Sequence, residues 1–420
     1  MVRLVAVLVA LALGTPASAQ VTVAISCGAV GVEFQLCREG AETWARETGN
    51  RVELVSTPAG STQRLALYQQ LLSAGSADID VLQLDVVWPG ILARNLLDLS
   101  EHVEAAELAP VFPALVQNNT VDGALVALPW FTNAGVLYFR RDLLEKHGHA
   151  VPETWAELTE TATRIMQAER AAGADRMWGF VFQGRAYEGL TVNALEWLHS
   201  HGGGRIVDPD GSVTVNTPHA IAAIRQAAGW VGRITPRGVL NYAEEDARGV
   251  FQSGNAVFMR NWPYAWPLMN AEDSAVRGRV GVALLPKGGP DGQHSATLGG
   301  EQLAVSRHSR NPEQAISLVR YLTSAAEQKR RAIIGGFNPT LRPLYQDAEV
   351  LAANPFFGEL YDTFLNAVPR PSAVTGRRYN QVSAEFWNAV HAVLAGQMAV
   401  EPALDRLERN LARIGRDGRW

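Results

Sequence analysis

The segment from residue 21 to residue 85 constrains the fold most, because strand-like and helix-like patterns alternate along it. In order, the patterns predict a strand at 21–26, a helix at 32–48, a strand at 51–55, a helix at 61–75 and a strand at 78–85. A β-α-β-α-β order is typical of a parallel sheet in an α/β domain. Ligands of such sheets bind beyond the carboxyl ends of the strands. We therefore expect the loops 27–33 and 57–63, together with Asp85, to border a binding site.

The first 19 residues have the pattern of a secretory signal. Arg3 precedes an apolar run from Leu4 to Leu13, and the small residues Ala17-Ser18-Ala19 follow. The run is shorter than the roughly 20 apolar residues that span a bilayer. We expect cleavage after Ala19 and export of a soluble mature chain.

Export affects the interpretation of the two cysteines, Cys27 and Cys37. In an oxidising compartment two nearby cysteines tend to form a disulfide, so we favour a Cys27–Cys37 disulfide. Two thiols alone support a metal site poorly, and a redox pair more usually has C-x-x-C spacing.

The pattern of the remaining sequence predicts further α/β structure. Two strand-like runs flank Pro129-Trp130 in "GALVALPWFTNAGVLYFRRDLLEKHG", which indicates a crossing between domains. Helices are predicted from Thr154, with Glu157 completing a capping box, and from Thr217-Pro218. "RVGVALLP" and "QLAVS" are predicted strands that return to the first sheet. A length of 420 residues also favours two or three domains.

Composition and motifs exclude several classes of function. The formal net charge is −5, and no basic stripe with interleaved aromatics suggests a nucleic-acid partner. The sequence contains no phosphate-binding G-x-x-x-x-G-K-[ST], no H-E-x-x-H and no G-x-S-x-G. The pairs His147/His149 and His199/His201 lack an obvious further ligand, so we expect neither a metal nor a cofactor.

Aromatic and polar side chains at predicted strand ends and loops indicate a binding function. The aromatic candidates are Trp88, Trp130, Trp262, Tyr264, Trp266 and Trp387; the polar candidates are Glu33, Asp85, Asn133, Glu188, Glu301 and Arg378. Aromatic rings pack against the C–H faces of sugars, while carboxylates, amides and guanidinium groups hydrogen-bond the hydroxyl rims. The combination suits a neutral carbohydrate.

Structural roles compete with ligand contact at several of these positions. Trp44, Trp155 and Trp197 lie in helical patterns and are assigned to the core. Core or hinge packing is an alternative for Trp88 and Trp130, helix capping for Asp85 and Glu188, and a surface position for Arg378. Within the proline-stiffened stretch "RNWPYAWPLMN" (260–270), ligand contact is favoured for Trp262 and Tyr264.

Several stretches resemble the extracellular solute-binding proteins of sugar-importing ABC transporters, family 1, in the maltose/trehalose-binding group. They include "CGAVGVEFQLC", "DIDVLQLDVVW", "VPETWAELTETA", "FQSGNAVFMRNWPYAWPLM", "LGGEQLAVSRHSRNPEQAISLVRYLTS" and "QVSAEFWNAVHAVLAG". The resemblance implies a two-lobed, maltose-binding-protein-like α/β fold with the ligand cleft between the lobes. It implies a signal peptide at 1–19, an N-terminal lobe at 20–129 plus 279–325, and a C-terminal lobe at 130–278 plus 326–420.

The resemblance also implies a ligand-binding set. Its members are Glu33, Asp85, Asn133, Glu188, Asn261, Trp262, Tyr264, Gly299, Gly300, Glu301 and Arg378. Relatives often carry an aromatic residue where this chain has Glu301.

The implied function is that of a monomeric periplasmic protein that binds an α-linked gluco-disaccharide of the trehalose or maltose type and delivers it to an ABC permease without catalysis. One alternative keeps the fold and changes the ligand to another sugar, a polyol, a glycerophosphodiester or an oligosaccharide. The other is a secreted glycoside hydrolase that uses two of the carboxylates Glu33, Asp85, Glu188 and Glu301.

Overall fold

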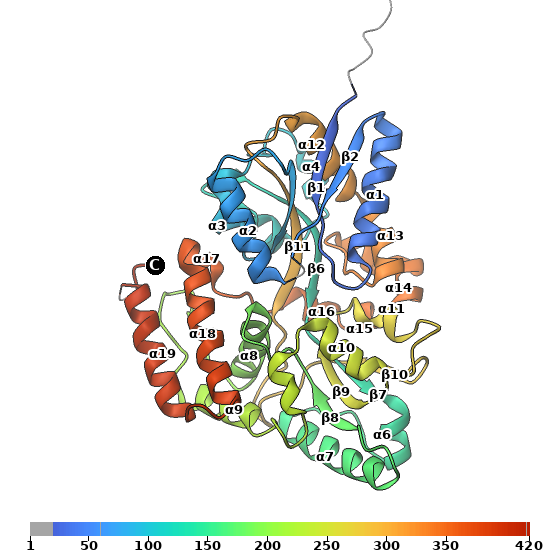
Figure 1. Cartoon of the computed structure of the whole chain (residues 1–420), viewed down its shortest axis with the longest axis vertical. Coiled ribbons are helices and arrows are strands. Elements are labelled where there is room, and N and C mark those ends of the chain that lie inside the picture. The colour runs from blue at the N-terminus through green and yellow to red at the C-terminus, as the bar shows by residue number, and fades with distance from the viewer. Residues whose placement is uncertain (1–19, 59, 417) are drawn as a thin grey trace, which may run out of the picture.

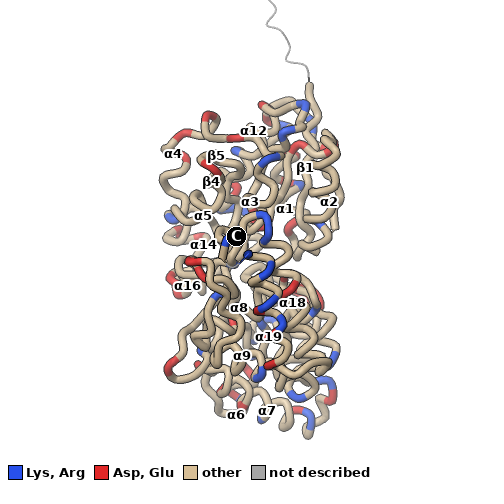
Figure 2. Tube along the Cα trace, turned by 90° about the vertical axis from the view of Figure 1, so that its left-hand side faces the viewer, with Lys and Arg blue, Asp and Glu red and all other residues tan. Residues whose placement is uncertain are grey.

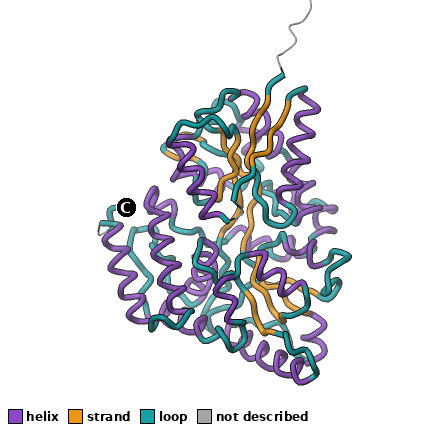
Figure 3. The backbone as a smooth tube through the Cα atoms, viewed as in Figure 1, coloured by secondary structure: helices purple, strands orange, loops and turns teal. Residues whose placement is uncertain are grey.

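The protein has two lobes, each built around its own β-sheet (Figure 1). The computed structural model describes residues 20–58, 60–416 and 418–420. The predicted signal segment 1–19 lies outside the described residues. In both lobes the strands occupy the centre and helices surround them (Figure 3).

The sheet of the upper lobe has the strand order β2-β1-β3-β11-β6. Its strands are β1 (Thr22–Ser26), β2 (Arg51–Val55), β3 (Val81–Asp85), β6 (Leu128–Ala134) and β11 (Leu298–Val305). The strand β1 pairs in parallel with β2 and β3, as the sequence pattern predicts. The strand β11 pairs antiparallel with both β3 and β6, so the complete sheet is mixed.

The sheet of the lower lobe has the order β10-β7-β9-β8. Its strands are β7 (Val136–Arg140), β8 (Trp178–Val181), β9 (Ala256–Asn261) and β10 (Val280–Ala283). The prediction that β10 returns to the first sheet is wrong, because β10 pairs antiparallel with β7. Apolar runs mark a strand but do not encode its partner, and β10 follows β9 after only a short helical connection.

Helices cover both sheets and connect the strands. In the upper lobe, α1 (Glu33–Thr48) packs against α12 (Pro312–Leu322) and α13 (Ala325–Gly335), and α2 (Ser61–Ser73) connects β2 to β3. The lower lobe contains α6 (Arg141–His147), α7 (Trp155–Ala171), α8 (Glu188–Ser200), α9 (Pro218–Ala228), α10 (Glu244–Gln252), α18 (Tyr379–Leu394) and α19 (Val400–Ile414).

The remaining elements are short. They are α3 (Pro89–Leu92), η1 (Ala93–Asn95), α4 (Ala105–Leu108), α5 (Pro113–Asn118), β4 (Thr120–Val121), β5 (Ala124–Leu125), η2 (Arg237–Asn241), α11 (Ala265–Met269), η3 (Arg342–Gln346), α14 (Ala348–Ala353), α15 (Phe356–Glu359), α16 (Tyr361–Leu365), α17 (Ser372–Thr375) and η4 (Gly376–Arg378).

Local sequence signals account for the starts of two helices. Thr154 and Glu157 form the predicted capping box of α7, in which each side chain satisfies a backbone N–H group. The hydroxyl of Thr217 accepts a hydrogen bond from the amide of Ala220 and caps α9, which begins at Pro218.

Large aromatic side chains form the lower core. The rings of Trp155, Phe180, Phe182, Trp197 and Trp230 lie within about 6 Å of one another in a connected cluster. Trp155 and Trp197 are fully buried there, and Trp44 is buried in the upper lobe. The prediction that these three tryptophans belong to the core is confirmed.

The chain passes between the lobes more than once. The strands β6 and β7 meet at Gly135, β10 precedes β11, and the segment 366–371 leads from α16 to α17. The helix α13 contacts α1 and α12, so part of the stretch after residue 325 packs on the upper lobe. The division at residues 129, 278 and 325 stays a prediction.

Neither charge distribution nor helix hydropathy marks out a separate region in the described part of the chain. Acidic and basic residues are interspersed along both lobes (Figure 2). No helix in the described part of the chain is both long and apolar enough to cross a membrane.

Candidate functional site

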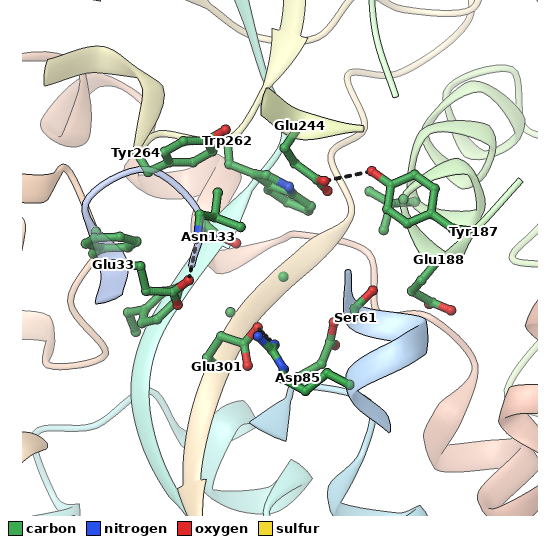
Figure 4. Close-up of a pocket in the computed structure, with 18 of the residues that line it drawn as sticks. Glu33, Ser61, Asp85, Asn133, Tyr187, Glu188, Glu244, Trp262, Tyr264 and Glu301 are labelled. Carbon is green, nitrogen blue, oxygen red and sulfur yellow. Dashed lines mark hydrogen bonds and ion pairs between the residues drawn. The ribbon is translucent and has the colours of Figure 1, made fainter. Parts of the chain in front are cut away.

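A cavity lined by charged, polar and aromatic side chains lies between the two lobes (Figure 4). The upper lobe contributes residues from α1, α2 and the ends of β3, β6 and β11, and the lower lobe contributes residues from α8, α10 and the segment after β9. The lining residues are Val30, Glu33, Ser61, Arg64, Asp85, Phe131, Asn133, Tyr187, Glu188, Gly189, Val192, Glu244, Trp262, Tyr264, Gly299, Gly300, Glu301, Phe337 and Arg370.

A second, larger cavity of about 800 Å³ has a different lining. Apolar residues dominate it, including Phe112, Leu115 and Phe364, and its charged residues Asp122 and Arg377 are exposed. The inter-lobe cavity instead gathers several buried or half-buried charged side chains. We therefore take the inter-lobe cavity as the candidate binding site because of its charged side chains, although it is the smaller of the two.

Glu33 begins α1 and is buried at the edge of the cavity. Its carboxylate accepts hydrogen bonds from the side-chain amide of Gln83, at 2.6 Å, and from the backbone amide of Val30, at 3.3 Å. The predicted disulfide between Cys27 and Cys37 is present, and it ties the end of β1 to α1 across this loop. The bridge therefore restrains the loop that presents Glu33.

Arg64 and Glu301 form a buried ion pair on the upper wall. The guanidinium Nη2 of Arg64 lies 2.9 Å from Oε1 of Glu301. The same guanidinium lies over the ring of Trp88, 5.3 Å from its centroid. Burial, together with the charges of Asp85 and Glu33, raises the pKa of Glu301 to about 8, although Arg64 acts in the opposite direction.

Glu301 should make stability depend on pH. Between its ordinary pKa of 4.5 and about 8, the folded protein retains a proton that the unfolded chain has released. The free energy of unfolding therefore falls as pH rises through this window, by up to about 1.4 kcal/mol per pH unit from this group. Urea denaturation across the window should show a shallower fall for Glu301→Gln than for the wild type. Parallel curves for the two proteins would contradict this role.

Arg370 links the two lobes. Its Nη2 lies 2.7 Å from Oδ1 of Asp85 at the end of β3, and its Nη1 lies 2.8 Å from Oε1 of Glu188 at the start of α8. Burial disfavours the guanidinium charge, but the two carboxylates outweigh it and raise the pKa of Arg370. The hydroxyls of Tyr379 and Ser383 on α18 also donate to Glu188. These contacts hold Asp85 and Glu188 at opposite sides of one cleft.

Trp262 forms part of the lower wall, immediately after β9. Its ring lies 4.0 Å from the guanidinium carbon of Arg260, which is itself paired with the buried Glu196 at 2.6 Å. The hydroxyl of Tyr138 donates to the carbonyl of Trp262 at 2.9 Å. The indole is thus supported from behind while it lines the cavity.

Glycines allow the backbone of β11 to approach this wall. A Cβ atom at Gly299 would lie 2.5 Å from Oδ1 of Asn133 and 2.9 Å from the indole of Trp262. Gly300 has a φ of 124° and faces the carbonyl of Phe131. A side chain at either position would displace the cavity wall.

Tyr264 forms part of the lower wall, whereas Asn261 lies outside the cavity and supports that wall. The hydroxyl of Tyr264 donates to Glu245 at 2.7 Å, and its ring packs against Gly31 of the upper lobe. Asn261 does not line the cavity. Its side chain instead accepts from the amide of Trp262, at 2.9 Å, and donates to the carbonyl of Glu244, at 3.1 Å. It therefore orients two residues that do line the cavity.

The structure brings most of the predicted site together. Glu33, Asp85, Asn133, Glu188, Trp262, Tyr264, Gly299, Gly300 and Glu301 all line the cavity. Arg378 does not; its Nη1 donates to the carbonyls of Ile414 and Arg419, each at 2.8 Å.

The other aromatic candidates have structural environments. Trp88, Trp130 and Trp387 are buried, and the indole N–H of Trp266 donates to the carbonyl of Ala353 at 3.1 Å. None of these four lines the cavity.

Sequence reasoning missed several lining residues, chiefly Arg64, Phe131, Tyr187, Glu244, Phe337 and Arg370. A signal existed for two of them. Arg64 lies in the first turn of the helix after the loop 57–63, and Tyr187 precedes the candidate Glu188. In the described residues, no cluster of three or more His, Cys, Asp or Glu side chains is arranged to hold a metal.

The disulfide should contribute to both stability and binding. It closes a loop with a sequence separation of 10 residues. The double variant Cys27→Ser/Cys37→Ser should lower the free energy of unfolding by about 2–3 kcal/mol and weaken ligand affinity, because the loop that carries Glu33 gains freedom. Urea denaturation and ligand titration of the variant measure both effects, and reduced wild-type protein serves as the control. Unchanged stability in both proteins would exclude this role.

Comparisons with known proteins agree with this architecture. Residues 35–329 match the family model described as bacterial extracellular solute-binding protein. A probable ABC transporter-binding protein of Deinococcus radiodurans is 54% identical over 395 residues, 94% of each chain. The solved structure of maltose-bound T. maritima MalE3 has a TM-score of 0.89 and 42% identity, covering 94% of this chain and 100% of that one.

A solute-binding protein of Agrobacterium vitis with bound D-mannitol has a TM-score of 0.80 at 21% identity, covering 94% of this chain and 98% of that one, and shows the shared fold alone. The family match covers more than half of the sequence. The chain therefore belongs to the bacterial extracellular solute-binding protein family, whose members are binding proteins and not enzymes.

Proposed function

We propose that this protein is the periplasmic sugar-binding component of an ABC importer, and that its ligand is an α-linked gluco-disaccharide of the trehalose or maltose type. The observation that carries the proposal is the inter-lobe cavity, in which Trp262 faces a wall of carboxylate and guanidinium groups. An indole packs against the C–H face of a pyranose, and the charged groups form strong hydrogen bonds with its hydroxyls.

One relative supports the ligand class, and another supports the link to a transporter. The MalE3 structure, at 42% identity, is described as maltose-bound. The Deinococcus radiodurans relative is named a probable ABC transporter-binding protein, which favours delivery to a permease in the inner membrane. The predicted signal segment supports export to the periplasm. One chain supplies both walls of the cavity, which supports a monomer as the functional unit.

Ligand binding would stabilise the closed arrangement of the lobes. The cavity walls come from both lobes, so a bound sugar contacts both only when the cleft is closed. A ligand shifts such an equilibrium by its difference in affinity for the two arrangements. We infer that the closed form is the one that the permease recognises.

The ligand class can be tested by calorimetric titration of the mature protein with trehalose, maltose, sucrose, mannitol and glucose. We expect trehalose or maltose to bind most tightly, with a Kd in the micromolar range or below, near −8 kcal/mol. Tightest binding of mannitol would replace the disaccharide by a polyol within the same fold. An absence of heat and of any thermal shift with all five compounds would refute the sugar-binding proposal.

A further inference from the structure

Glu301 lies on the upper wall of the inter-lobe cavity, and its two carboxyl oxygens have different surroundings. Oε1 accepts a hydrogen bond from Nη2 of Arg64 at 2.9 Å. Oε2 is buried and has no hydrogen-bond partner among the described residues. A buried polar atom without a partner costs free energy. Oε2 is therefore the atom of this side chain that a ligand in the cavity would satisfy.

The surroundings of Glu301 favour its neutral form. Asp85 is its direct neighbour in the pairing of β11 with β3, and both side chains line the upper wall of the cavity (Figure 4). Burial, together with the charges of Asp85 and Glu33, outweighs Arg64 and raises the pKa of Glu301 to about 8. At pH 7 the pair therefore consists mostly of a guanidinium group and a neutral carboxyl group. Since Oε1 accepts from Arg64, the proton belongs on Oε2, which makes that atom a hydrogen-bond donor.

Two further groups of the cavity lining are donors without partners. Nε of Arg64 and Nε of Arg370 are buried and make no hydrogen bond in the described part of the chain. Both arginines line the cavity, and their side chains are only 3% and 2% exposed. Oδ1 of Asn133 is the unpartnered acceptor in the described lining. The upper wall therefore suits the oxygens of a sugar, whose hydroxyl, ring and glycosidic oxygens all accept hydrogen bonds.

We propose that Glu301 binds the sugar as a neutral carboxylic acid whose Oε2–H donates to a sugar oxygen, and that sugar affinity falls when Glu301 ionises. This inference rests on the proposed sugar-binding function and assigns a specificity-determining role to one residue of that site. A bound sugar favours the protonated form in two ways. It accepts the proton in a hydrogen bond, and it displaces the water that would solvate the carboxylate. Binding therefore takes up a fraction of a proton from the buffer near the pH at which Glu301 ionises.

Other ionisable groups near Glu301 do not account for a pH dependence between pH 7 and pH 9. Besides the three charged neighbours named above, Tyr68 on α2 and Arg331 on α13 interact electrostatically with Glu301. Burial raises the pKa of Tyr68 to about 12 and lowers that of Arg331 to about 10, so both stay largely protonated. Burial also raises the pKa values of the lining residues Tyr187 and Tyr264 well above 10. The described lining contains no lysine, histidine or cysteine.

Calorimetric titration of the mature protein with trehalose and with maltose between pH 6.5 and pH 9 tests the proposal. Neither sugar ionises in this range, so a pH dependence comes from the protein. If Glu301 ionises about one pH unit higher in the complex, affinity should be about fivefold weaker at pH 9 than at pH 7. At pH 8, titrations in buffers of different ionisation enthalpy should show uptake of about 0.4 protons per sugar bound.

Variants connect the pH dependence to Glu301. Glu301→Gln should abolish both the pH dependence and the proton uptake, whatever it does to the affinity at pH 7, because an amide retains a donor and does not ionise. Glu160→Gln, which changes an exposed carboxylate on α7, is the matched control and should retain the wild-type pH profile.

The outcomes separate this inference from the function on which it rests. If wild-type protein binds either sugar equally well at pH 7 and pH 9, without proton uptake at pH 8, the role of Glu301 is refuted while the sugar-binding function stands. An affinity that rises with pH would also refute it, because the carboxylate would then be the form that binds. The same pH profile in Glu301→Gln as in the wild type would assign the titration to another group. If neither sugar binds at any pH, the proposed function fails and the inference fails with it.

Discussion

Replacement of Trp262 by alanine should weaken disaccharide binding by about 30- to 150-fold, which corresponds to about 2–3 kcal/mol. The indole lines the cavity and is held in place by the guanidinium group of Arg260, which stacks on its ring, and by the hydroxyl of Tyr138, which donates to its backbone carbonyl. Truncation removes the flat apolar surface on which a pyranose packs. Calorimetric titration of wild type and variant measures the loss directly.

Trp178→Ala provides a matched control for this prediction. Trp178 is also half-buried and stacked with an arginine, Arg170 at 4.4 Å, but it lies on β8 outside the cavity. We expect its removal to leave sugar affinity within about twofold of the wild type. Trp262→Phe should show an intermediate loss, since a smaller ring remains. Equal affinities for wild type and Trp262→Ala would show that the indole does not contact the sugar.

Removal of the charge in Arg370→Gln should have the largest effect, at least a hundredfold loss of affinity together with a lower melting temperature. The guanidinium group joins Asp85 of the upper lobe to Glu188 of the lower lobe, and it is almost completely buried. Loss of one partner from a buried ion pair costs about 3–5 kcal/mol, because the other charges stay buried without compensation. The penalty applies to the closed arrangement that binds the ligand.

Arg370→Lys and Arg378→Gln define the controls. Lysine retains the charge but cannot reach both carboxylates with a planar fork, so Arg370→Lys should fold with an intermediate affinity. The family resemblance predicts Arg378 as the ligand-binding arginine, whereas the observed contacts favour Arg370. A small loss of sugar affinity in Arg378→Gln and a large loss in Arg370→Gln would support Arg370 as the ligand-binding arginine. The reverse result would restore the prediction from the resemblance.

The sequence predicted the upper lobe well, because its signals are local. Periodicity located the strands β1 and β3, and the rule that ligands bind beyond the carboxyl ends of parallel strands placed Glu33 and Asp85 near the site. Proline stiffening and the tryptophan content of residues 260–270 similarly identified Trp262. The export pattern and the nearby cysteines predicted the disulfide, which the structure contains.

The missed features depend on contacts between distant parts of the chain. Arg370 follows no local pattern; it joins the site because the segment 366–371 passes between the lobes, 285 residues beyond Asp85. Glu244 resembles an ordinary acidic residue in the first turn of a helix, and only the packing of α10 beside β9 directs it to the cavity. The predicted return of β10 to the first sheet is wrong for the same reason, because the apolar pattern of a strand does not specify the strand with which it pairs.

A sugar should bind between the lobes and pack on the indole of Trp262. A crystal structure of the protein with the disaccharide that binds most tightly in the titration would show this binding mode. We expect a pyranose ring in contact with Trp262, with its hydroxyls within hydrogen-bond distance of the carboxylates of the upper lobe. A sugar bound outside the inter-lobe cavity, with no contact to Trp262, would rule this binding mode out.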